Sequence, residues 1–299
     1  MSILQRRIGA DAVAAKGWLR AQRWLVLRRA VQASVLALFL AGPWFGVWIV
    51  KGNLTSSLTL GVLPLTDPYV LAQSLAAGYV PLRSAWIGAA IVLVFYVLVG
   101  GRAFCSWVCP VNPLTDAAAW LRTRLGIRGG AHVSRRTRYA VLALTFVVAA
   151  ASGIVAWELV NPVSMLHRGL IFGIGAMWAI LLAVVLFDLF VMRRGWCGHL
   201  CPMGAFYSLT AHFSVLRVVA ARRERCNDCL DCFAVCPEPV VIRPALKGIG
   251  GAGPVIGAAN CTNCGRCIDV CAPDVFEFGT RWSARASPRP QPRTAAPQE

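Results

Sequence analysis

Four long stretches of this chain are apolar all round, with no polar face. They cover residues 31–50, 85–101, 139–157 and 169–192. Each has roughly the 17–25 residues that a helix needs to cross the hydrocarbon core of a bilayer. Helices on the surface of a soluble protein keep a polar face, so the pattern predicts four transmembrane helices.

Charge along the chain predicts the orientation of these helices. Arginine and lysine are concentrated before the first stretch, between the second and third, and after the fourth. The only basic residues of the two remaining connections are Lys51, Arg83 and Arg168. Cytoplasmic segments of membrane proteins carry this excess, so both termini and the middle connection are expected in the cytoplasm. The bias explains most of the net charge of +17. Nucleic-acid binding is not expected, because the basic residues are not clustered on a soluble fold.

Eight of the twelve cysteines form two copies of one spacing near the C-terminus. In bacterial two-cluster ferredoxins, which share this spacing, the last cysteine of each run binds the cluster held by the other run. The first predicted [4Fe–4S] cluster therefore has as ligands Cys226, Cys229, Cys232 and Cys271. The second has as ligands Cys261, Cys264, Cys267 and Cys236. Zinc sites favour cysteine pairs separated by a longer loop, and a reducing cytoplasm disfavours disulfides.

The other four cysteines belong to a second repeat. Residues 102–110 read R-A-F-C-S-W-V-C-P and residues 194–202 read R-G-W-C-G-H-L-C-P, each at the cytoplasmic end of a predicted helix. Cys105 and Cys109 are four residues apart, as are Cys197 and Cys201, so each pair can share one face of a helical turn. The duplication favours a function over buried structural thiols. A further metal centre, a redox-active dithiol and a Cu(I)-handling site all remain open.

These patterns together predict an α-helical integral membrane protein with a small α+β module. The membrane part would consist of four transmembrane helices in two repeated hairpins, and the module would be a bacterial two-[4Fe–4S] ferredoxin-like domain. The expected order is a basic lead-in at 1–29, the membrane domain at 30–221, the ferredoxin-like domain at 222–280 and a tail at 281–299. Proline, arginine, alanine and serine dominate the tail, which predicts disorder.

Several longer motifs carry a resemblance to a known family. They are G-P-W-F-G-V-W at 42–48, P-L-T-D-P at 64–68, W-E at 157–158, N-P-V-S at 161–164, both C-x3-C-P repeats and both ferredoxin runs. With them the chain resembles the NapH family, the ferredoxin-type membrane components of the quinol dehydrogenase that serves periplasmic nitrate reductase. One departure is Ala272 between Cys271 and Pro273, where the ferredoxin pattern has proline directly after cysteine.

The resemblance implies a place in electron transport at the bacterial inner membrane. Electrons would leave the quinol pool and pass towards a NapG-like periplasmic ferredoxin-like partner, a NapC-like multihaem cytochrome and nitrate reductase. Relatives that share both cysteine patterns handle metals during assembly of respiratory enzymes, so an assembly factor is the alternative. A further alternative is an anchoring subunit whose clusters serve mainly to dock partners.

Acidic residues near the predicted spans are candidates for accepting the protons of a quinol. Asp188 is the one acid inside a span, and Glu158 stands at the outer end of the third. Asp67 lies in the outer connection. A carboxylate in a membrane is costly, so such groups are candidates for proton transfer. The alternative for Asp188 and Glu158 is an ion pair with arginine at the adjoining helix end.

Overall fold

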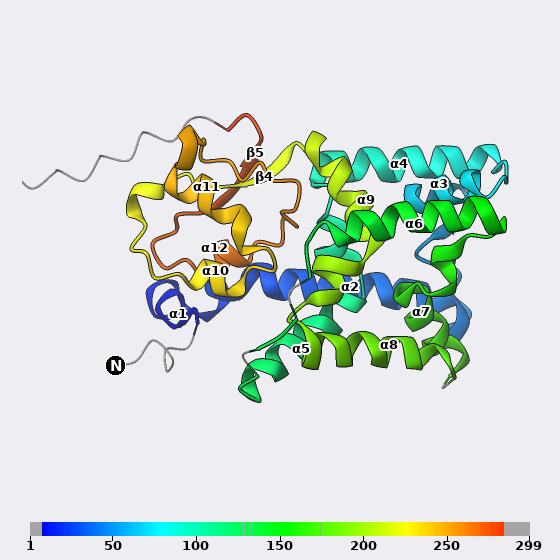
Figure 1. Ribbon diagram of the computed structural model, residues 1–299, viewed down its shortest axis with the longest axis horizontal. Coiled ribbons are helices and arrows are strands. Elements are labelled where there is room, and N and C mark those ends of the chain that lie inside the picture. The colour runs from blue at the N-terminus through cyan, green and yellow to red at the C-terminus, as the bar shows by residue number, and fades with distance from the viewer. Residues whose placement is uncertain (1–7, 128, 132, 174, 284–299) are drawn as a thin grey trace, which may run out of the picture. The chain divides into compact units, whose positions relative to one another are not determined.

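The computed structural model describes residues 8–127, 129–131, 133–173 and 175–283 (Figure 1). The chain divides into two compact units. One contains the described parts of Met1–Val26 and Val215–Glu299, and the other is Leu27–Ser214. The first unit extends beyond the expected ferredoxin-like domain, because it includes most of the N-terminal lead-in.

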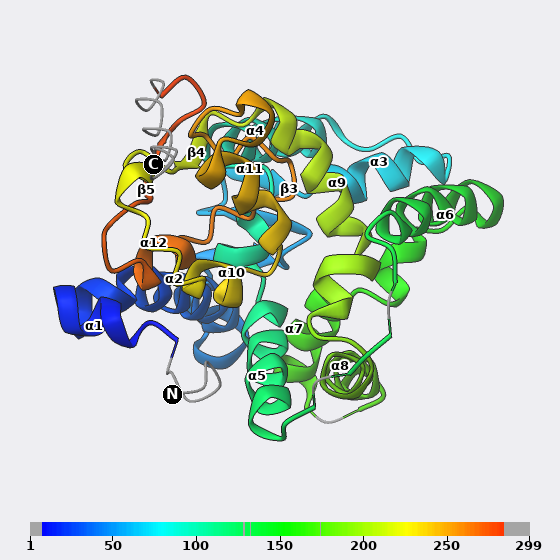
Figure 2. The same cartoon turned by 60° about the vertical axis from the view of Figure 1, so that its left-hand side comes forward.

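The first unit is a small α+β fold built around the eight ferredoxin-run cysteines. Its elements are α1 (Ala10–Lys16), β4 (Leu216–Val219), η6 (Arg223–Arg225), α10 (Asp231–Val235), η7 (Pro239–Val241), α11 (Ile242–Lys247), η8 (Ile249–Gly251), α12 (Arg266–Val270) and β5 (Glu277–Thr280). Strands β4 and β5 pair antiparallel, with Val218 opposite Phe278. Helices α10 and α12 lie side by side in both views (Figures 1 and 2). Buried aliphatic residues such as Ile242 and Ile268 form one core with the cysteines.

The N-terminal lead-in is tied to this unit by specific hydrogen bonds. The Gly9 backbone N–H donates to the Asp231 carboxylate at 2.9 Å. The backbone N–H groups of Trp24 and Leu25 donate to the two carboxylate oxygens of Asp269, at 3.2 and 2.9 Å. Bonds to a charged acceptor are among the stronger ones in proteins. Much of the segment expected to be only a basic lead-in is therefore part of the ferredoxin-like fold.

The second unit joins a three-stranded sheet to a set of helices. Its elements are the remainder of α2 (Trp18–Phe45), β1 (Val50–Gly52), β2 (Ser56–Thr59), β3 (Leu63–Thr66), α3 (Pro68–Ala76), α4 (Arg83–Val99), η1 (Phe104–Val108), α5 (Val111–Arg124), α6 (Thr137–Ser152), η2 (Ala156–Leu159), α7 (Pro162–Phe172), α8 (Met177–Leu186), η3 (Phe187–Val191), η4 (Trp196–Leu200), α9 (Pro202–Thr210) and η5 (Ala211–Phe213). The strands run antiparallel in the order β1-β2-β3. Helix α6 packs on α3 and α9, and α7 packs on α8 (Figure 1).

Strand β3 lies directly against α4 because a glycine leaves room for it. A Cβ placed on Gly88 would lie 2.9 Å from the backbone nitrogen of Thr66 and 3.0 Å from its hydroxyl oxygen. Real Cβ atoms essentially never approach another heavy atom within 3.0 Å. The next residue, Asp67, caps α3, and its carboxylate accepts hydrogen bonds from the first turn. The sheet and the capped helix α3 thus hold the connection between α2 and α4 against α4.

The apolar stretches are helical, but their bounds differ from those predicted. Among the described residues, α2 is the one helix long and apolar enough to cross a membrane by itself; α4, α6 and Met177–Val191 are apolar but shorter. Helix α2 begins at Trp18, well before the expected residue 31, because arginines lower the hydropathy without interrupting the backbone. Helix α6 ends at Ser152, where Gly153 adopts a φ of 68°.

The prediction of one helix over 169–192 is wrong. Helix α7 ends at Phe172, Gly173 adopts a φ of 88°, and α8 begins at Met177. Glycine occupies this left-handed region at little cost, so the backbone can leave the helix there. The break falls within an unbroken apolar run, so hydropathy alone does not reveal it.

Candidate functional site

The two ferredoxin runs fold into matching loops. The second residue after the first cysteine has a left-handed backbone in both runs, with φ of 56° at Asp228 and 48° at Asn263. The fourth residue does too, with φ of 65° at Leu230 and 72° at Gly265. Helices α10 and α12 start directly after these positions. Leucine rarely adopts a left-handed backbone conformation. The occurrence of this conformation at a matching position of both runs indicates that the two loops are shaped to hold the same kind of ligand.

The structure brings together the four cysteines predicted for the first cluster. Burial raises the pKa of the Cys232 thiol to about 12, and the thiols of Cys271, Cys229 and Cys226 contribute to this rise, in that order. Crowded thiols resist ionisation because their negative charges would repel one another. Iron bound between these thiolates would supply the positive charge that offsets this repulsion. Cys271 comes from the other run, as the crossed pattern requires.

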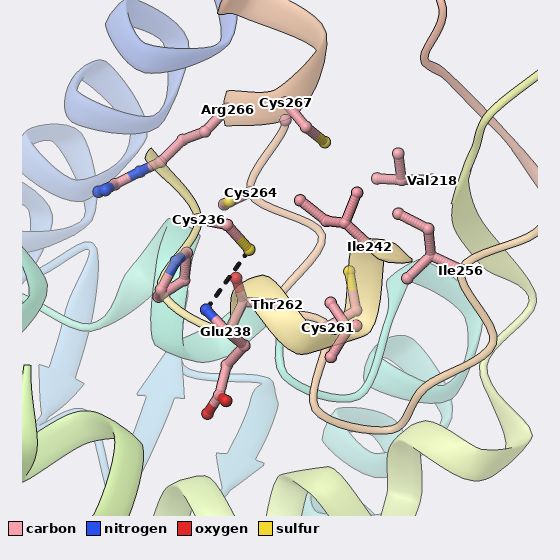
Figure 3. A pocket seen from close by; sticks show the side chains of 13 residues that line it. Val218, Cys236, Glu238, Ile242, Ile256, Cys261, Thr262, Cys264, Arg266 and Cys267 are labelled. Carbon is pink, nitrogen blue, oxygen red and sulfur yellow. Dashed lines mark hydrogen bonds between the residues drawn. The ribbon is translucent and has the colours of Figure 1, made fainter. Parts of the chain in front are cut away.

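The second group of four cysteines lines one small pocket. Figure 3 shows Cys236 from the first run facing the pocket together with three cysteines of the second run. The second-run members are Cys261, Cys264 and Cys267. Burial, and then the thiols of Cys264, Cys261 and Cys236, raise the pKa of Cys267 well above its usual value.

Backbone donors point at two of these sulfurs. The N–H of Glu238 donates to Cys236 Sγ at 3.4 Å (Figure 3), and the N–H of Val275 donates to Cys271 Sγ at 3.4 Å. Hydrogen bonds to cluster-binding sulfurs are one way in which a protein sets a reduction potential. Among the described residues, no three Cys, His, Asp or Glu side chains could hold a single metal ion. A [4Fe–4S] cluster binds each thiolate at a different iron, so its ligands need not converge on one point. Partly or fully buried cysteines, two of them with N–H donors at the sulfur, fit two such clusters.

Lys16 is a residue near this site that the sequence reasoning did not single out. Its Nζ donates to the carbonyl oxygens of Ile268 and Cys271, both at 2.9 Å, and forms an ion pair with Asp274 at 2.9 Å. A lysine more than 250 positions away in the sequence gives no pattern that could have revealed this contact. The structure thus places a positive charge beside one cysteine of the first group.

We expect Lys16→Met to lower the midpoint potential of the cluster bound through Cys271, by on the order of tens of millivolts. A nearby positive charge stabilises the added electron, and methionine keeps the length of the side chain without the charge. The measurement is an anaerobic redox titration of the full-length protein, followed by EPR. Lys16→Arg, which retains the charge, is the matched control. Equal potentials in Lys16→Met and the unaltered protein would contradict the assignment of an electrostatic role to this lysine.

The C-x3-C-P repeats also adopt one shape, which is wider than the α-helical turn expected from their spacing. Each forms a π-type turn, η1 or η4, closed by a 2.9 Å bond from the N–H of Cys109 to Phe104 O and from that of Cys201 to Trp196 O. Such turns are rare and recur at functional sites. Cys201 then caps α9 and accepts from Gly204 N–H at 3.5 Å.

The four thiols of these repeats lie within electrostatic reach of one another. Burial is the largest cause of the high pKa of Cys197, the charge of Asp188 comes next, and the thiols of Cys201, Cys109 and Cys105 add to it. Arg102 and Arg138 donate to the carbonyls of Cys197 and Gly198, at 3.2 and 3.4 Å. Gln32 on α2 donates to Ser106 O at 2.9 Å. The structure therefore gathers both repeats into one supported thiol group.

The two acids proposed as quinol-proton acceptors lie in different surroundings. Asp188 is fully buried at the start of η3, and its Oδ1 accepts from the Trp196 N–H at 2.9 Å. Glu158 accepts from Asn161 Nδ2 and from the Ser164 hydroxyl, each at 2.8 Å. The first bond connects Asp188 to the second C-x3-C-P turn, and the others hold Glu158 at the start of α7. As proton acceptors both stay predictions.

Comparison with known proteins agrees with this division of the cysteines. A family model described as a 4Fe-4S dicluster domain matches residues 218–272. A second model, described as a 4Fe-4S binding domain, matches twice, at 84–128 and 174–218, once over each C-x3-C-P repeat. With the folded cysteine groups, these matches define an iron–sulfur electron-transfer protein of the ferredoxin type.

Curated relatives cover nearly the whole chain. Ferredoxin-type protein NapH of Escherichia coli (strain K12) is 48% identical over 96% of this chain and 99% of its own length. NapH of Haemophilus influenzae is 49% identical over 89% of this chain and 93% of its own. Methylamine utilization ferredoxin-type protein MauN of Methylorubrum extorquens is 55% identical over 91% and 94%. The chain belongs to the family of ferredoxin-type proteins that includes NapH and MauN. No solved structure matches it.

Proposed function

We propose that this chain is the iron–sulfur subunit of a membrane quinol dehydrogenase and passes electrons from the quinol pool towards periplasmic nitrate reductase. The observation that carries the proposal is the 48% identity to E. coli NapH over 96% of the chain. The cysteine groups support it, because [4Fe–4S] clusters accept and donate electrons one at a time. A ferredoxin-like NapG-like protein and a NapC-like multihaem cytochrome are the proposed partners.

In this proposal the eight cysteines of the ferredoxin runs bind two [4Fe–4S] clusters with the last cysteine of each run exchanged. The four C-x3-C-P thiols bind a third metal centre. Support for the third centre comes from the mutual proximity of those thiols and from the 4Fe-4S family match over each repeat.

A membrane location with four spans is also part of the proposal. Large apolar side chains are exposed on the shorter apolar helices, for example Trp86 and Val94 on α4 and Val147 on α6. Exposed apolar surface of this extent is typical of contact with lipid or a partner. The four spans would correspond to α2, α4, α6 and the segment from α8 through η3.

The topology is tested by reporter fusions. A fusion after Gly61 or Leu159 should be active as a periplasmic reporter, and one after Leu125 or Glu277 only as a cytoplasmic reporter. The reason is the excess of Lys and Arg in the segments placed inside. Periplasmic activity after Glu277 would contradict the cytoplasmic placement of the clusters.

A second candidate function is electron transfer in methylamine utilization. The identity to MauN of M. extorquens, 55%, is higher than that to E. coli NapH, 48%. Both candidate functions use the same cysteine groups and differ in the proteins that exchange electrons with this chain. The surfaces that bind those partners, rather than the cysteines, would therefore distinguish the two functions.

Complementation tests the choice between the two candidates. The chain is expected to restore periplasmic nitrate reduction in E. coli lacking NapH, whereas a Cys232→Ala variant serves as the inactive control. If the chain instead restores only the growth on methylamine of M. extorquens lacking MauN, the second candidate is favoured. Assembly-factor function would instead show as a metal defect in a partner enzyme and no quinol oxidation.

A further inference from the structure

A cavity of about 330 Å³ lies inside the second unit, between α2, the β-sheet, α4 and η1. Its walls are mainly apolar and include Phe39 on α2, Phe95 on α4, and Phe104 and Val108 on η1. Sites for small organic ligands are typically apolar cavities of 300–1,000 Å³ with a few polar groups. The aromatic walls suit a flat ring.

The cavity reaches an exposed apolar surface. Ile91 and Phe95 line it, yet they are 37% and 52% exposed, and Val94 between them is 57% exposed. A ligand can therefore enter from the outer face of α4, which is apolar. A lipid-soluble molecule fits this route better than a charged metabolite does, because entry removes little polar surface from water.

The polar groups of the cavity centre on Asp67, which is 4% exposed. Its Oδ1 accepts from the N–H groups of Tyr69 and Val70, at 2.8 and 3.2 Å, which is the ordinary cap of α3. Its Oδ2 accepts from the hydroxyl of Tyr207 at 2.8 Å. Tyr207 is fully buried on α9 and also lines the cavity. Capping does not require this second bond, so a carboxylate–phenol pair faces the ligand space.

The groups around Asp67 set its proton affinity. Burial raises the pKa of Asp67 to about 6, whereas its hydrogen bonds from Tyr207, Val70 and Tyr69 lower it and the charge of Glu158 raises it slightly. Tyr96 is the other titratable residue lining the cavity. A carboxylate that exchanges its proton near neutral pH suits general-base chemistry.

The same cavity adjoins the first C-x3-C-P turn. Phe104 and Val108 are the first and last residues of η1, and the thiol-bearing residues Cys105 and Cys109 directly follow them. The ring of Phe104 stacks on Tyr207 with centroids 5.4 Å apart. A ring bound in the cavity would therefore lie beside both the proton acceptor and one pair of the proposed metal-binding thiols.

We propose that this cavity binds the ring of a membrane quinol and that the Asp67 carboxylate, held by Tyr207, accepts a quinol proton. The proposal rests on the proposed function. A quinol becomes a quinone by losing two protons and two electrons. One hydroxyl proton goes to Asp67 Oδ2, and after its release to water the second follows. The electrons go singly to the iron–sulfur carriers. Neither Asp188 nor Glu158 lines the cavity.

The test uses the full-length protein in lipid nanodiscs with two measurements. One is binding of a hydroxyquinoline N-oxide, a quinol analogue whose fluorescence is quenched on binding. The other is the rate at which a short-chain quinol reduces the clusters in a single turnover. Ile91→Trp fills the cavity, and Val147→Trp places the same residue at an exposed position of α6 that does not line the cavity. Iron content confirms that each variant retains its clusters.

We expect Ile91→Trp to weaken analogue binding by about tenfold or more, and Val147→Trp to leave it unchanged. Asp67→Asn should keep the analogue within a few-fold of the normal affinity and slow cluster reduction by about 100-fold, in the range of a lost general base. The normal rate should rise with pH through about 6, because only the ionised carboxylate accepts a proton. This rise should vanish in Asp67→Asn.

Other outcomes separate this proposal from the proposed function. Reduction of the clusters by quinol at the normal rate in both Ile91→Trp and Asp67→Asn would overturn the cavity assignment and leave the function standing. Clusters that quinol never reduces, with no analogue binding in the unaltered protein, would overturn both. If Asp67→Asn does not fold, Tyr207→Phe and Ile91→Trp decide: normal rates in both reject the proposal.

Discussion

Replacing Cys271 and Cys232 together by alanine is expected to remove about four iron atoms per chain, whereas replacing Cys271 and Cys267 together should remove about eight. The reason is the exchange of the last cysteines between runs. Cys271 lies with Cys232, Cys229 and Cys226, so the first pair belongs to one cluster. Cys267 lies with the other group, so the second pair belongs to two clusters. Alanine cannot act as an alternative ligand.

Iron and acid-labile sulfide per chain, measured after anaerobic purification, check this result. The reciprocal pair Cys236→Ala with Cys264→Ala is a matched control and should also lose about four iron atoms. Losses of about eight from Cys271 with Cys232 and about four from Cys271 with Cys267 would show that each run binds its own cluster. That outcome would contradict the arrangement of the thiols in the fold.

Replacing Cys109 and Cys201 together by alanine is expected to remove the third metal centre and leave the two clusters of the ferredoxin-like unit. Each C-x3-C-P repeat then keeps only one thiol, and two thiolates in a buried site do not complete the four-cysteine ligation of a cluster. Reduction of the remaining clusters by quinol should fall to background, because the proposed quinol cavity lies beside Cys105 and Cys109.

The metal lost in this variant also decides between the alternatives for the second repeat. Loss of iron supports a third iron–sulfur centre, and loss of copper supports a metal-handling function. Unchanged metal content in this variant, together with thiols of the unaltered protein that become alkylated only after reduction, would support a redox-active dithiol and contradict the third centre. Thr115→Val, at a residue whose hydroxyl lies 3.8 Å from Cys197 Sγ, is a control that retains all four thiols.

Cysteine spacing predicted the grouping of the ferredoxin thiols because most ligands of each cluster lie on one short loop. The crossed fourth ligand followed from the ferredoxin pattern, and the structure places Cys271 with the first group. The gathering of the two C-x3-C-P pairs was a hypothesis from their duplication. Their π-type turns were not predictable, because the spacing of two cysteines is compatible with several helical geometries.

Other features depend on contacts between distant residues and left no local signal. Lys16 reaches Cys271 across 255 positions, and Tyr207 reaches Asp67 across 140. The β-sheet in the outer connection was not foreseen, because Gly88 on a separate helix makes room for it. Hydropathy found the apolar helices but missed the break at Gly173, where backbone conformation rather than polarity ends the helix.

The most direct test of the proposed function is EPR spectroscopy of the anaerobically purified full-length protein before and after addition of a reduced quinol. We expect the reduced [4Fe–4S] signals of the two ferredoxin-run clusters to appear with quinol and to be absent from the Cys271→Ala, Cys267→Ala pair. Clusters that dithionite reduces but quinol leaves oxidised, in nanodiscs that contain the proposed NapG-like and NapC-like partners, would contradict it.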